Sequence, residues 1–152
     1  MAAHFIDTSA LVRRYDRTEP GAGRVQAICR PSASNTLIIS RITPVEVASA
    51  LARKTREGVL DADRQTVLWR SFLTHWRRQY HAVTVDDQVL REAQRLVLAH
   101  SLRAYDAVQV ACAVRVGRII AGGTGDPLRF LTADRAQAHT ARAEGLDVEL
   151  IA

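Results

Sequence analysis

The sequence predicts an α/β protein, an α/β/α sandwich with a mostly parallel central sheet. Five short apolar runs typical of strands alternate with helical stretches. Most of these stretches are long enough for the crossovers that parallel pairing requires. The 152 residues fit a single domain, residues 1–152. No run of about 18 apolar residues occurs, so we expect no membrane-spanning helix.

Strands are predicted where short runs rich in β-branched or aromatic residues are bounded by polar or turn residues. They cover residues 3–7, 36–40, 81–85, 128–133 and 147–151. The first run ends in an acid, Asp7, and TLIIS forms the second. HAVTV forms the third, LRFLTA follows a glycine-rich loop at 122–125, and DVELI follows Gly145.

Helices are predicted where apolar residues recur at helical spacing behind a capping residue. They cover residues 9–17, 20–30, 43–57, 61–79, 86–101, 104–116 and 134–144. Pro20 lies near the start of the second, and Thr43 is expected to cap the third with Glu46 three residues later. Asp61 is expected to cap the fourth. The fifth is amphipathic, whereas the sixth is apolar almost all round and should be buried.

The charge of the chain is basic, with a formal net charge of +5. A basic surface attracts polyanions, and arginine suits phosphate, but a solubilising surface explains the charge equally well. The two cysteines lie in apolar helical context and no signal-peptide pattern is present, so we expect a cytoplasmic protein.

Four acids interrupt apolar context at strand ends or helix starts: Asp7, Glu46, Asp106 and Asp134. These positions fall at the carboxyl edge of a parallel sheet, where α/β proteins place their sites. Asp7 and Asp134 could instead be helix N-caps, and Glu46 could form a capping box with Thr43. Asp106 lies among apolar residues, where a solvated surface acid fits poorly.

Converging carboxylates repel one another unless a cation holds them. A ligand set of oxygens without a His or Cys cluster favours Mg²⁺ or Mn²⁺ over zinc. Such a cation can activate a water and stabilise charge on a phosphodiester, so acids together with a basic surface indicate a nuclease.

Four segments resemble, in order, the motif blocks of PIN-domain ribonucleases and, more narrowly, of the VapC toxins of bacterial type II toxin–antitoxin pairs. The segments are DTSAL at 7–11, SRITPVEVASALAR at 40–53, LRAYDAVQVACA at 102–113 and FLTADRAQAHTARAEGLDV at 130–148. The resemblance spans residues 4–151 and implies a PIN-like fold.

The resemblance also implies roles. The four acids would hold Mg²⁺ or Mn²⁺, with Asp7 and Asp106 as the most direct ligands and Glu46 and Asp134 nearer the attacking water or a second metal. The implied hydroxyls that would orient these groups are those of Thr8, Ser9 and Thr132. The implied reaction is endonucleolytic hydrolysis of RNA. The implied partners are a VapB-like antitoxin and a second copy of the chain in a homodimer.

Two assignments near the site stay open. Asp126, in GGTGDP, could assist or replace Asp134, although a turn role before a proline is the interpretation that we favour. Arg13, Arg14 and Arg41 could reach RNA phosphates, or could lie on solvated helix faces.

Two other functions are alternatives to a ribonuclease. The first is a non-catalytic PIN-like RNA-binding module. The second is a haloacid-dehalogenase-like phosphotransferase, which would draw on the acid pair Asp86-Asp87 and on Lys54, the only lysine.

Overall fold

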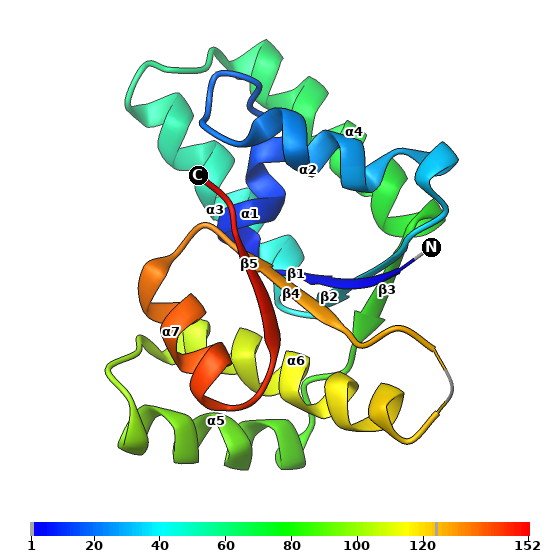
Figure 1. Cartoon of the computed structure of the whole chain (residues 1–152). Coiled ribbons are helices and arrows are strands. Elements are labelled where there is room, and N and C mark those ends of the chain that lie inside the picture. The colour runs from blue at the N-terminus through cyan, green and yellow to red at the C-terminus, as the bar shows by residue number, and fades with distance from the viewer. Residues whose placement is uncertain (1, 124) are drawn as a thin grey trace.

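The computed structural model describes residues 2–123 and 125–152, so Met1 and Thr124, the latter within the predicted glycine-rich loop, lie outside the described residues. A five-stranded sheet has the order β3-β2-β1-β4-β5 (Figure 1). The strands are β1 (Ala3–Ile6), β2 (Thr36–Ser40), β3 (Tyr80–Val83), β4 (Arg129–Thr132) and β5 (Asp147–Leu150). Each neighbouring pair is parallel, so the predicted α/β class is confirmed.

Helices cover both faces of the sheet. They are α1 (Thr8–Leu11), α2 (Ala22–Cys29), α3 (Thr43–Arg56), α4 (Ala62–Arg78), α5 (Asp87–Ala99), α6 (Ala104–Ala121) and α7 (Arg135–Ala143), with the short 3-10 turns η1 (Val12–Arg14) and η2 (Pro31–Ala33). In Figure 1, α1–α4 lie on one face and α5–α7 on the other. None of the helices in the described ranges is long and apolar enough to cross a membrane.

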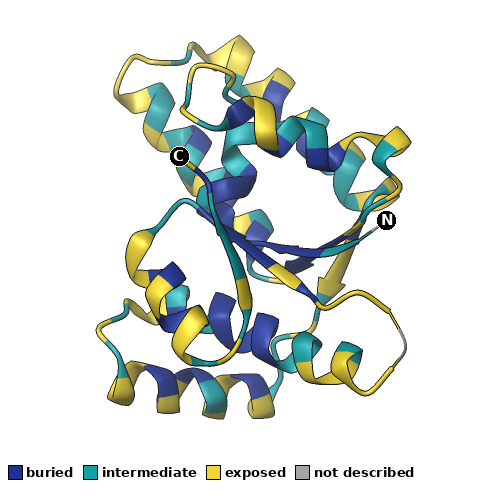
Figure 2. Ribbon diagram, in the orientation of Figure 1, coloured by how far each residue is buried: buried dark blue, intermediate teal, exposed yellow. Residues whose placement is uncertain are grey.

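Side chains alternate between the two faces of the strands and build a core on each. Ile6, Ile39 and Leu131 pack with α1–α4, whereas Phe5 and Phe130 pack with α5–α7. Figure 2 shows buried residues on both sides of the sheet. The central strands are therefore buried on both faces, which is why their sequences read as continuous apolar runs.

Two helices differ most from their predicted lengths, whereas the bounds of the others move by at most two residues at either end. The helix predicted over 9–17 is a single α-turn that tightens into η1, because the chain bends away before Pro20. The helix predicted to end at 116 continues to Ala121 through Gly117. A Cβ at that glycine would lie 3.0 Å from Leu146 Cδ2, so the glycine permits close packing instead of ending the helix.

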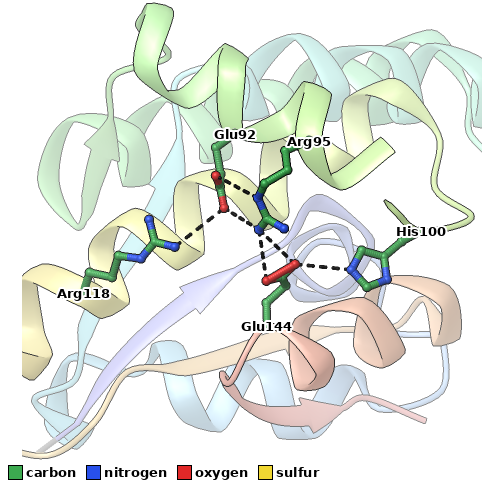
Figure 3. Close-up of polar contacts among 5 residues, drawn as sticks. All are labelled: Glu92, Arg95, His100, Arg118 and Glu144. Atoms are coloured by element: carbon green, nitrogen blue, oxygen red, sulfur yellow. Dashed lines mark hydrogen bonds and ion pairs between the residues drawn. The ribbon is translucent and has the colours of Figure 1, made fainter. Parts of the chain in front are cut away.

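A cluster of charged residues links α5, the end of α6 and the residue after α7 (Figure 3). Its members are Glu92, Arg95, His100, Arg118 and Glu144. Arg95 Nη2 lies 2.7 Å from Glu92 Oε1 and 2.9 Å from Glu144 Oε1. His100 Nε2 lies 3.2 Å from the same oxygen of Glu144. Partly exposed pairs of this kind each contribute about 0–1 kcal/mol, so the cluster orients α5 and α7 more than it stabilises them.

Candidate active site

The four predicted acids line one cavity of about 610 Å³ at the carboxyl edge of the sheet, here called the acidic cavity. Asp7 follows β1 directly, and Asp134 follows β4. Because Ile6 pairs with Leu131 in neighbouring parallel strands, the residues after both strands emerge side by side. Glu46 comes from the first turn of α3 and Asp106 from the first turn of α6.

Asp7 is buried and its carboxylate is fixed by protein donors. Its Oδ2 accepts hydrogen bonds from the backbone N–H of Ser9 at 3.2 Å and from the Ser9 hydroxyl at 2.5 Å, and the Thr132 hydroxyl lies 3.1 Å away. Its Oδ1 accepts from Gln137 Nε2 at 3.1 Å. The carboxylate therefore caps α1 and faces the acidic cavity at the same time, so the two predicted roles are compatible.

Glu46 does not form the capping box that its spacing from Thr43 predicts. The N-cap of α3 is Ile42, which has no side-chain acceptor, and Thr43 is already inside the helix. The Glu46 carboxylate instead accepts from Thr8 Oγ1 at 3.1 Å and from Gln109 Nε2 at 2.6 Å. These buried partners come from α1 and α6, and they hold the Glu46 carboxylate of α3 at the acidic cavity.

Asp134 and Asp106 complete the cavity in different ways. Asp134 is the N-cap of α7, and its Oδ1 accepts from the Gln137 backbone N–H at 3.0 Å. The Asp106 carboxylate is half-buried and has no hydrogen-bond partner within residues 2–123 and 125–152. Asp106 is therefore the acid whose charge the protein itself compensates least.

Burial raises the pKa values of three of the acids, and repulsion by neighbouring carboxylates adds to the effect for Glu46 and Asp106. Burial, followed by the charges of Asp7 and Asp134, raises the pKa of Asp106 to about 6. Burial raises the pKa of Asp7 despite the hydrogen bonds from Ser9 and Gln137. Burial and the charges of Asp7 and Asp106 also raise the pKa of Glu46. A cation in this cavity would relieve the repulsion and favour the ionised forms.

The donor set fits a hard divalent cation, because it offers carboxylate and hydroxyl oxygens and no thiol or imidazole. As they lie, no three Asp, Glu, His or Cys side chains of the described segments are close enough together to complete a metal site. Mg²⁺ commonly keeps several waters and takes only one or two carboxylates from the protein. The acidic cavity therefore suits a partly hydrated ion better than a closed cage.

Two glutamines that the sequence reasoning did not identify hold this arrangement together. Gln109 and Gln137 are fully buried and lie one helical turn after Asp106 and Asp134. Gln109 Nε2 also lies 3.0 Å from Thr8 Oγ1, and Gln137 Nε2 lies 3.3 Å from the Asp106 carbonyl oxygen. For Gln109 the available signal was a second polar residue, after Asp106, within the apolar run YDAVQVACA, since a buried amide requires partners.

The rim of the acidic cavity carries residues other than the predicted arginines. Arg53, Arg103 and Tyr105 line it, and Tyr105 is 64% exposed. These rim residues were not predicted, because a charge pattern alone does not show which helical faces meet at the site.

The predicted arginines lie elsewhere. Arg13 donates to the Pro20 carbonyl oxygen, and Arg41 lies over the Trp76 ring. Arg14 donates to the Tyr80 hydroxyl at 2.8 Å and lines a different cavity. Their contact with RNA stays a prediction, and no arginine of this set lines the acidic cavity.

The remaining acids are remote from the site. Asp126 is exposed and precedes β4, whereas Asp134 follows it, so the strand separates the two acids and Asp126 cannot assist Asp134 in this structure. Asp86 caps α5 and pairs with Arg115, and Lys54 pairs with Asp16 and Glu19. The phosphotransferase alternative therefore lacks its lysine and its second acid pair near Asp7.

Solved structures with the same fold include three similar proteins. VapBC2 from Rickettsia felis, solved with a promoter DNA fragment, matches with a TM-score of 0.65 and 11% identity, covering 99% of both chains. FitAcB from Neisseria gonorrhoeae matches with a TM-score of 0.64 and 14% identity, covering 95% of both chains. PAE2754 from Pyrobaculum aerophilum matches with a TM-score of 0.61 and 19% identity, covering 97% of this chain and 83% of PAE2754.

Sequence comparison gives the family. Among curated proteins it finds no match to the chain. The family model described as the PIN domain matches residues 4–143. This range contains each of the four acids, the two glutamines, β2–β4 and all of β1 except Ala3. The chain therefore belongs to the PIN domain family.

Proposed function

We propose that this PIN-domain protein is a metal-dependent endoribonuclease of the VapC toxin type. The observation that carries the proposal is the convergence of Asp7, Glu46, Asp106 and Asp134 on one cavity, with raised pKa values for three of them. PIN domains are nucleases, and strongly perturbed carboxyl groups in a cleft indicate a functional site.

The residues divide the work of phosphodiester hydrolysis. Mg²⁺ or Mn²⁺ would supply the positive charge that activates a water and stabilises the attacked phosphate. Asp7 and Asp106 would hold the ion, with Glu46 and Asp134 toward the water or a second ion. Ser9 and Thr132 fix the Asp7 carboxylate, and Thr8 fixes that of Glu46, so the acids are oriented before the substrate binds.

We also propose a proteinaceous inhibitor, a VapB-like antitoxin. One structural neighbour is the VapBC2 complex from Rickettsia felis, and another, at a TM-score of 0.56 and 17% identity, is a toxin–antitoxin complex from Klebsiella pneumoniae. A homodimer is a separate proposal from the family resemblance, and sedimentation of the purified chain tests it.

Cleavage of total cellular RNA by the purified protein, with Mg²⁺ or Mn²⁺ against EDTA, tests the nuclease. Asp7→Asn and Asp106→Asn are expected to abolish metal-dependent fragments. Asp126→Asn, which removes the same charge at an exposed position outside the acidic cavity, is the matched control and is expected to cut like wild type.

Equal cleavage by wild type and both site variants would contradict the proposal and indicate a contaminating nuclease. Tight RNA binding without cleavage under either metal would favour the non-catalytic RNA-binding module instead.

A further inference from the structure

A second large cavity, of about 570 Å³, lies among η1, α2 and α4 and is here called the arginine cavity. Its lining includes four guanidinium groups and no carboxylate: Arg14, Arg17, Arg30 and Arg64. Within the described residues none of the four pairs with an acid, whereas arginines such as Arg24 and Arg95 do. The arginine cavity therefore concentrates uncompensated positive charge in a concave surface.

Arg14, Tyr15 and His75, which line the arginine cavity, are joined through Tyr80 in a fixed polar network. Arg14 Nη1 donates to the Tyr80 hydroxyl at 2.8 Å, and its guanidinium lies 5.7 Å from the centre of that ring. The Tyr80 hydroxyl lies 2.7 Å from that of Tyr15, which lies 2.7 Å from His75 Nδ1. These contacts hold the Arg14 guanidinium in one orientation, and its remaining N–H groups are available for an anion.

A smaller cavity lies between the arginine cavity and the acidic cavity and shares lining residues with each. This linking cavity, of about 230 Å³, shares Val12 and Ala50 with the acidic cavity and Tyr15, Arg17 and Arg64 with the arginine cavity. In Figure 1, α3 and α4, which contribute walls of the linking cavity, lie on the same face of the sheet.

Asp16 is the one acid of the described residues that lines the linking cavity, and its negative charge is paired with Lys54. Lys54 Nζ lies 2.6 Å from Asp16 Oδ2. A ligand passing between the two larger cavities therefore meets no unpaired carboxylate in the linking cavity.

We propose that the arginine cavity binds backbone phosphates of the same RNA strand whose phosphodiester lies in the acidic cavity. This inference rests on the proposed function. The acidic cavity repels RNA, so affinity has to come from a basic surface that the same strand can reach. Guanidinium groups match phosphate oxygens in geometry, and a strand carries one phosphate per nucleotide, so a strand held at the acidic cavity has further phosphates to offer the arginine cavity.

Binding of a short fluorescent single-stranded RNA, measured by anisotropy in EDTA at several salt concentrations, tests the inference. The cavity variant is Arg30→Gln with Arg64→Gln, both exposed at the rim, so that the Arg14 network stays intact. The matched control is Arg70→Gln with Arg77→Gln, both exposed on α4 and absent from the lining. Both pairs lower the net charge equally.

The cavity variant is expected to bind RNA more weakly than the control and to show a shallower salt dependence. The slope of log affinity against log salt should fall by about 0.7 for each phosphate that the protein no longer neutralises, hence by about 1.4 for two. Equal affinities and slopes for the two variants would overturn the inference. The inference would also be overturned if the cavity variant bound RNA as tightly as the control but bound a glutamate-rich peptide more weakly. That result would assign the arginine cavity to an acidic protein segment.

The measurement separates this inference from the nuclease. Because EDTA prevents metal-dependent cleavage, a protein that never cuts RNA still reports on the arginine cavity. Weakened RNA binding by the cavity variant in a protein without nuclease activity would leave the inference standing and remove only the proposed reaction.

Discussion

Replacing Asp106 with asparagine is expected to stabilise the metal-free protein at neutral pH while abolishing the proposed cleavage. The pKa of Asp106 in the folded protein lies above its ordinary value because of burial and the charges of Asp7 and Asp134. A raised carboxyl pKa means that the fold favours the protonated form. The contribution of the protonated Asp106 carboxyl to the free energy of unfolding is fully present below the pKa of the unfolded chain. It is lost as the pH rises through the pKa of the folded protein.

The size of the effect follows from the pKa. The pKa rises from 3.8 to about 6, a difference of about 2 units, which corresponds to about 3 kcal/mol. Because the carboxyl is partly exposed, solvent screening reduces this to about 1.5 kcal/mol. For a domain of this length, the variant should melt about 3–6 °C above wild type at pH 7.5. At pH 4.5 the difference should fall to about a third of that, because the folded wild type is then largely protonated.

Thermal unfolding followed by circular dichroism in EDTA, at pH 7.5 and pH 4.5, provides the measurement. Asp126→Asn is the control, since it removes an exposed carboxyl outside the acidic cavity and should leave the melting temperature unchanged. A variant no more stable than wild type at pH 7.5 would refute the argument that burial and the neighbouring charges disfavour the ionised Asp106 carboxylate. A gain of equal size at both pH values would assign the effect to packing.

Three further predictions concern the site and the core. Mg²⁺ or Mn²⁺ should raise the melting temperature of wild type more at pH 7.5 than at pH 5, because protons compete for the same carboxylates; equal shifts would argue against binding at the acids. Gln137→Ala should lower the free energy of unfolding, measured by urea denaturation, by about 2–3 kcal/mol, since it removes a donor to the buried Asp7. A decrease no larger than that caused by Gln88→Ala, at an exposed glutamine, would contradict this. Phe72→Ala should cost about 3–5 kcal/mol, because Phe72 is fully buried against Trp69 and Tyr80. A value below about 1 kcal/mol would show that this core repacks freely.

The sequence was most informative where periodicity and strand ends coincide. The order of strands and helices follows from alternating apolar runs, and the placement of Asp7 and Asp134 follows from parallel strands that end at one edge. Whether Asp7 caps a helix or faces the site could not be decided from sequence, because its two oxygens do both. Local spacing favoured a capping box for Glu46, but the tertiary contact with Gln109 prevails.

Longer-range features were beyond local patterns. The roles of Gln109 and Gln137 depend on which helices meet over β1, and no spacing rule encodes that meeting. Arginine side chains are long, so their contacts depend on neighbouring elements as much as on their own helix. Arg14 illustrates this, because its partner Tyr80 comes from β3, at the far edge of the sheet from β5.

The strand order has a consequence for protein synthesis. β1 lies at the centre of the sheet and hydrogen-bonds to both β2 and β4, although β4 leaves the ribosome long after β1. A nascent chain that has emerged only through α6 already carries Asp7, Glu46 and Asp106. It still lacks Thr132 and Gln137, so Asp7 has neither of these partners and the centre of the sheet is open on one side. The complete acidic cavity can therefore form only after translation has passed β4 and α7, so under the proposed function an unfinished chain on the ribosome is expected not to cleave the RNA around it.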